Sequence, residues 1–98
     1  MAATPGIEQV DGRLCVSGPV TLSHVLALLD QSRRMFTATD LRIDLSGVSE
    51  ADSSAVALML EWERQARLRG ASIRFENLTE SLKTLIGLYD VGELLPGA

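Results

Sequence analysis

Residues 43–58 read IDLSGVSEADSSAVAL and carry the chain from a strand, through a short polar segment, into a helix. Leu41–Leu45 alternates apolar and polar residues with a period of two, which predicts a strand with one buried face. Residues 46–52 are polar and predict a connecting segment. The helix is predicted from about Ser53 to Arg69, because Gly70 follows at the position where a left-handed cap is commonest.

The segment before this stretch predicts a hairpin and a helix. Residues 7–10 and 13–17 flank Asp11-Gly12, a pair that tolerates the positive φ angles of a two-residue turn and would set Ile7 opposite Val16. Gly18-Pro19 is expected to end the second strand. A helix from Leu22 to Phe36 follows, capped by Thr21 or Ser23, with a predicted buried stripe of Leu22, Val25, Leu26, Leu29 and Phe36.

The segment after it predicts a strand over 72–76, a helix over 79–89 and an apolar tail over 91–95. The element order is therefore β-β-α-β-α-β-α, and the unit from 41 to 76 should hold two parallel strands joined by a right-handed crossover. We expect an α/β fold, a mixed sheet of about four strands with helices packed on it. At 98 residues, the chain 1–98 should form a single domain.

Composition narrows the functional classes. The net charge is −4, which argues against nucleic acid as a partner, and no apolar run is long enough for direct insertion into a membrane. The single cysteine, Cys15, excludes an internal disulfide and fits a reducing, cytoplasmic compartment. With one histidine, His24, and no nucleophile or phosphate-loop motif, we expect a non-enzymatic protein with no metal and no cofactor.

The candidate site is the start of the helix at Asp52, Ser53 and Ser54. Each of these side chains can accept a hydrogen bond from a free backbone N–H of the first turn, so capping alone would explain them. The alternative is that one of them meets a partner, because the same geometry exposes a hydroxyl and tolerates phosphate. Three adjacent polar side chains can divide these roles.

The stretch resembles the signature of STAS domains, in which a strand ends in Asp-Leu-Ser (here 44–46) and Asp-Ser-Ser (here 52–54) opens a helix. Residues 77–96 resemble the C-terminal half of the MlaB type, the cytoplasmic STAS subunits of a bacterial phospholipid ABC transporter. The resemblance implies a subunit that binds the ATPase, and through it the permease, peripheral to the inner membrane. It implies that Ser53 is a partner-binding residue and possible phosphosite, within a partner-binding loop and helix start that includes Asp52, Ser54 and Ala55.

Two alternatives stay open on the sequence. The first is an anti-sigma-factor antagonist, in which a partner kinase phosphorylates Ser53, although Ala55 stands where such antagonists usually have glycine. The second concerns Trp62, one turn after Leu58 and Met59, which is either a packing residue or an interface anchor.

Overall fold

A computed structural model describes residues 4–98 and contains the predicted order of strands and helices. The elements are β1 (Gly6–Val10), β2 (Arg13–Val20), α1 (Val25–Met35), β3 (Asp40–Ala51), α2 (Ser53–Leu68), β4 (Ser72–Glu76), α3 (Glu80–Tyr89) and a 3-10 turn, η1 (Gly92–Leu94). The sheet order is β1-β2-β3-β4, with β1 antiparallel to β2 and the other two pairs parallel. The α/β prediction of a mixed four-stranded sheet is confirmed.

The hairpin forms as its turn residues require. Ile7 lies opposite Val16, and Asp11 and Gly12 have φ angles of 51° and 77°. Both values lie in the left-handed region that a two-residue turn between twisted strands demands.

Two strands are longer than the sequence predicts. The strand expected to end at Gly18-Pro19 continues to Val20, and the segment expected to connect strand and helix at 46–52 remains in β3 as far as Ala51. Gly18 lies beside Val48 and Val20 beside Ala51, so the two extensions pair with each other. This pairing carries the starts of α1 and α2 to the same end of the molecule.

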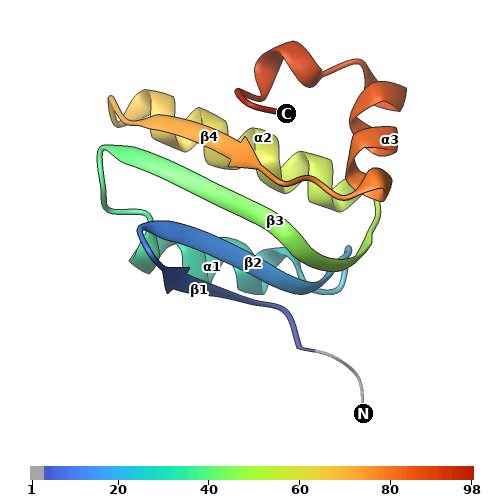
Figure 1. Cartoon of the computed structure of the whole chain (residues 1–98), viewed down its shortest axis with the longest axis horizontal. Helices are drawn as coiled ribbons and strands as arrows, with labels where there is room; N and C mark the ends of the chain where they lie inside the picture. The colour runs from blue at the N-terminus through green and yellow to red at the C-terminus, as the bar shows by residue number, and fades with distance from the viewer. Residues whose placement is uncertain (1–3) are drawn as a thin grey trace.

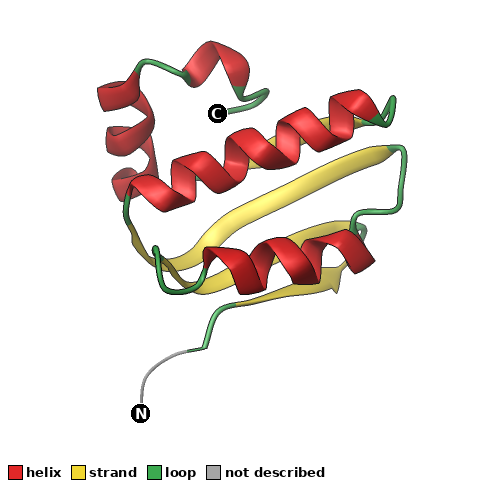
Figure 2. Ribbon diagram, turned by 180° about the vertical axis from the view of Figure 1, so that it is seen from behind, coloured by secondary structure: helices red, strands yellow, loops and turns green. Residues whose placement is uncertain are grey.

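The sheet has one covered and one uncovered face. Helices α1 and α2 run side by side across the covered face, and in the part of the chain that is described no helix lies on the other (Figures 1 and 2). The uncovered face carries polar groups, among them Glu76, whose carboxylate lies 3.4 Å from Arg13 and 2.9 Å from Arg42. The chain then turns back, and the N–H of Phe75 donates to the carbonyl oxygen of Pro96 at 2.8 Å, so the tail lies along β4.

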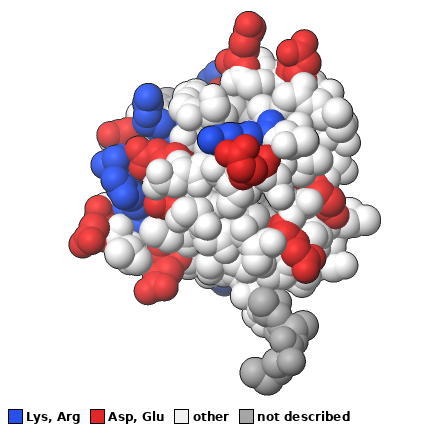
Figure 3. Space-filling view, turned by 45° about the vertical axis from the view of Figure 1, so that its right-hand side comes forward, with Lys and Arg blue, Asp and Glu red and all other residues white. Residues whose placement is uncertain are grey.

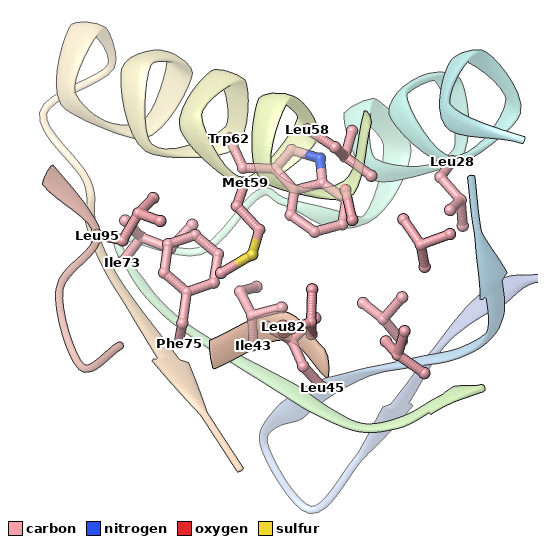
Figure 4. Packing of buried hydrophobic residues seen from close by; sticks show 14 of the residues in the cluster. Leu28, Ile43, Leu45, Leu58, Met59, Trp62, Ile73, Phe75, Leu82 and Leu95 are labelled. Carbon is pink, nitrogen blue, oxygen red and sulfur yellow. The ribbon is translucent and has the colours of Figure 1, made fainter. Parts of the chain in front are cut away.

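The core lies between the sheet and the helices, and Trp62 of α2 is at its centre (Figure 4). The indole is 1% exposed and its Nε1–H donates to the hydroxyl of Ser32 in α1 at 2.8 Å. That hydroxyl in turn donates to the carbonyl oxygen of Leu29 at 2.7 Å. The buried indole therefore has a hydrogen-bonding partner, which a buried N–H needs.

The side of α1 that faces the core differs from the side that the sequence predicts. Leu28 and Ser32 are the buried residues of the helix, whereas Leu22 and Leu26 are 76% and 78% exposed. The helix begins at Val25 rather than Leu22, and neither Thr21 nor Ser23 caps it. Val25, Leu29 and Phe36 of the predicted stripe are partly buried against the core. The prediction was wrong for Leu22 and Leu26, because helical spacing reveals an apolar row without showing that Ser32 must face inward to meet Trp62.

Candidate functional site

Asp52 caps α2 and connects its start to the turn before α1. One carboxylate oxygen accepts the N–H of Ser54 at 2.8 Å, and the other accepts the N–H of Leu22 at 3.1 Å. Burial raises the pKa of this carboxyl, but hydrogen bonds from Leu22 and Ser54 outweigh burial and hold the pKa below its ordinary value. The side chain is therefore ionised at neutral pH and joins the start of α2 to the turn that precedes α1.

The hydroxyl of Ser53 takes no part in capping α2. Ser53 is the first residue of α2 and is exposed, and among residues 4–98 no group hydrogen-bonds to its hydroxyl. Asp52 carries the cap, so the Ser53 hydroxyl points to solvent at the positive end of a sixteen-residue helix. The first turn thus separates a structural carboxylate from an available hydroxyl.

The other predicted site residues differ in how deeply they are buried. Ser54 is half-buried beside Ser53, whereas Ala55 is 2% exposed and packs in the core. The Ala55 side chain is enclosed in the core, so the prediction that this helix start binds a partner depends on its exposed and half-buried neighbours. Trp62 is equally enclosed, so the packing alternative holds for it and the interface-anchor alternative does not.

A buried carboxylate explains the first part of the signature. Asp44 is 8% exposed and accepts hydrogen bonds from the N–H and the hydroxyl of Ser46, at 2.9 and 2.7 Å. It also accepts from the side-chain amide of Asn77 at 2.9 Å. Burial raises its pKa, while these bonds from Ser46 and Asn77 lower it, and the net direction is downward. Asp44 thereby joins β3 to the loop that leads into α3.

All three helices start at the same end of the sheet (Figure 1). α3 begins there with Thr79 as its cap, whose hydroxyl accepts the N–H of Leu82 at 3.3 Å. A shallow polar groove separates this helix start from the end of β3, lined by Ser49 and Glu50 on one side and Thr79 and Ser81 on the other. Sequence reasoning missed this groove, because the pairing that extends β3 is not visible in local patterns.

A second groove, apolar in character, lies on the other side of the α2 start, between α1 and α2. The exposed leucines Leu22 and Leu26 line it, and they are the residues that were expected in the core. Their helical spacing is visible in the sequence as an apolar row, but the sequence does not show that these two leucines are exposed rather than buried. The start of α2 therefore lies between the two grooves, because Ala51 lines the polar one and Ser54 lines the apolar one.

Acidic groups surround this end of the molecule: Glu50 lines the polar groove, Glu61 lines the apolar groove, and Asp52 caps α2. Figure 3 shows acidic groups spread over this side of the molecule, with most of the basic groups toward the left of the view. Within residues 4–98, no three histidine, cysteine, aspartate or glutamate side chains lie close enough together to hold a metal ion. Over the same residues, no helix has both the length and the apolar character needed to cross a bilayer.

Comparison with known proteins places this site in context. A family model described as Mlab, STAS domain matches residues 3–96. A search of curated proteins gives no match. Among solved structures, the chain is similar to the anti-sigma factor antagonist SpoIIAA in its unphosphorylated form, with a TM-score of 0.71 and 17% identity. The similarity covers 94% of this chain and 85% of the other, and at this identity it shows a shared fold.

Proposed function

Because the chain belongs to the family of MlaB-type STAS domains, we propose that it is a non-enzymatic subunit that binds the ATPase of a phospholipid ABC transporter. The observation that carries the proposal is the free Ser53 hydroxyl at the start of α2, beside a cap supplied by Asp52. A small neutral hydroxyl suits a close-packed protein interface, whose centre is depleted in charge. The complex would support assembly or activity of a system that maintains outer-membrane lipid asymmetry.

In this proposal, the ATPase supplies the nucleotide chemistry and links the subunit to the permease at the cytoplasmic side of the inner membrane. The chain has no phosphate-loop motif. We expect the isolated domain to show neither ATP binding nor turnover by calorimetric titration. Specific binding at micromolar ATP, with hydrolysis, would contradict the non-enzymatic assignment.

The test places a charge on the Ser53 position. Ser53→Glu should leave the domain folded, because a carboxylate near a helix N-terminus typically stabilises the helix by about 0.3–1 kcal/mol. It should weaken capture of the ATPase by at least about tenfold, since an unpaired charge would be buried against the partner. Ser17→Glu, at an exposed position of β2 that lines neither groove, is the matched control and should bind like wild type. A folded Ser53→Glu protein with wild-type affinity would remove Ser53 from the interface.

A second candidate is an anti-sigma-factor antagonist switched by phosphorylation of Ser53. The exposed hydroxyl favours it, because a kinase can reach the group and the helix N-terminus accommodates the added phosphate. The two candidates differ in their partner. Purification from native membranes should return an ATPase and a permease in the first case and a soluble kinase in the second.

A further inference from the structure

The groove between α1 and α2 is formed by two matching rows of side chains. Each row has the spacing i, i+3, i+4, i+7, which places its members on one face of a helix. The rows consist of Leu22, Val25, Leu26 and Leu29 from α1 and its preceding turn, and of Ser54, Ala57, Leu58 and Glu61 from α2. At about 1.5 Å per residue, each row runs along the groove for roughly 10 Å, the length of two helical turns.

The groove is exposed and its charge is already balanced. Leu22 and Leu26 are 76% and 78% exposed, far more than the other apolar members of α1. The one ionisable group in the lining, Glu61, lies 2.7 Å from Arg64 and also accepts a hydrogen bond from Gln65 at 2.8 Å. An occupant therefore needs an apolar face and no compensating cation.

The size of the groove argues against a separate partner that binds here alone. Eight residues line it, whereas a stable interface usually engages about 20–30 residues on each side. A second copy of this chain held only by the groove would fall short of that requirement. The groove is continuous with the Ser53 surface, however, because Ser54 lines it and Asp52 holds the N–H of Leu22.

We propose that the groove receives one amphipathic helix of the same ATPase that docks on Ser53, an inference that rests on the proposed function. The helix presents apolar side chains three and four residues apart, which enter between the two rows and cover Leu22 and Leu26. This is the common mode in which an amphipathic helix binds a hydrophobic groove. The Ser53 surface and the groove then form one interface of adequate size.

The experiment measures the dissociation constant of the purified ATPase subunit for wild type, Leu26→Glu and Leu68→Glu. Leu68 is 70% exposed near the end of α2 and lies outside the groove lining, so it is a matched control for an exposed leucine that gains a charge. Leu26→Glu should weaken binding at least tenfold and Leu68→Glu by no more than about twofold. Leu26→Met keeps an apolar side chain at this position and should bind the ATPase with near wild-type affinity. Circular dichroism checks that each variant is folded.

A photo-reactive residue at position 26 identifies the occupant directly. Cross-linking to a helical segment of the ATPase supports the inference, while cross-linking to a loop or strand overturns it. If Leu26→Glu binds like wild type and Ser53→Glu does not, the groove is not part of the interface and the proposed function stands. If the wild-type protein does not bind the ATPase, the proposed function and the inference about the groove are both contradicted. A wild-type dimer in sedimentation that Leu26→Glu dissociates would assign the groove to a second copy and overturn the inference.

Discussion

Replacing Asp52 by alanine should destabilise the domain, whereas replacing its neighbour Ser53 by alanine should not. The structure gives all the capping to Asp52, whose carboxylate accepts the N–H groups of Ser54 and Leu22. Sequence reasoning alone left the cap open between adjacent polar residues. The pair of variants therefore tests the division of roles on which the candidate site depends.

The expected magnitude follows from the two bonds. Loss of an N-cap side chain costs about 0.5–2 kcal/mol, and loss of the Leu22 contact adds about 0.5–1 kcal/mol, since water can reach it. A total of about 1–3 kcal/mol in a 98-residue domain corresponds to a fall in Tm of about 5–20 °C. Ser53→Ala removes a solvated hydroxyl and should change the free energy of unfolding by less than about 0.5 kcal/mol.

Urea and thermal unfolding monitored by circular dichroism will measure both effects. Asp52→Ser is an informative third variant, because serine caps a helix well but cannot reach two N–H groups at once; it should lose only the smaller part. The pKa of Asp52 in the folded state lies below its ordinary value of 3.8. The stabilisation by Asp52 is therefore fully present above pH 3.8 and is lost as the pH falls through the pKa of the folded state. The difference in the free energy of unfolding between wild type and Asp52→Ala should therefore become smaller in acid. Equal destabilisation by Ser53→Ala and Asp52→Ala would refute the assignment of the cap.

Three further changes test the core and the buried polar groups. Leu58→Ala should cost about 2–5 kcal/mol through the cavity it leaves, measured by urea unfolding; a melting curve matching wild type would contradict the packing of α2. Ser32→Ala should cost about 1–3 kcal/mol because the Trp62 indole loses its partner, and a double-mutant cycle with Trp62→Phe should show coupling rather than additivity. Asp44→Asn should cost about 1–3 kcal/mol at pH 7. Because the pKa of Asp44 is lowered in the folded state, that cost should shrink as the pH falls below 3.8, and a cost independent of pH would argue against an ionised Asp44.

The features that sequence reasoning predicted well are those encoded by neighbours along the chain. The Asp11-Gly12 turn requires two positive φ angles, and Gly70 at φ 75° ends α2 as predicted. Alternation over 41–45 identified the buried face of β3, and the order of elements then predicted that the strand at 72–76 is parallel to it. These local patterns can be interpreted without knowing which residues far along the chain lie in contact with them.

The failures share one physical cause, a partner far away in the sequence. Residues 46–51 are too polar to indicate a strand, yet their backbone pairs with residues 17–20 of β2. Ser32 is buried because Trp62, thirty residues later, needs an acceptor. The same contact fixes which side of α1 faces the sheet, and so leaves Leu26 exposed. The position of Ser53 was predicted, but its freedom from capping depended on Asp52 and could be seen only in the structure.

The tail along β4 makes the two borders of the sheet unequal and bears on self-association. Unpaired backbone groups at a sheet border invite strand addition from another molecule, a common route to aggregation. Near Phe75 that border is occupied by Pro96 of the same chain. At the opposite border, the side-chain amide of Gln31 donates to the carbonyl oxygen of Ile7 at 3.2 Å, which reduces the groups that β1 leaves open. At Phe75 and at Ile7, contacts within the chain therefore occupy backbone groups that would otherwise be open to strand addition.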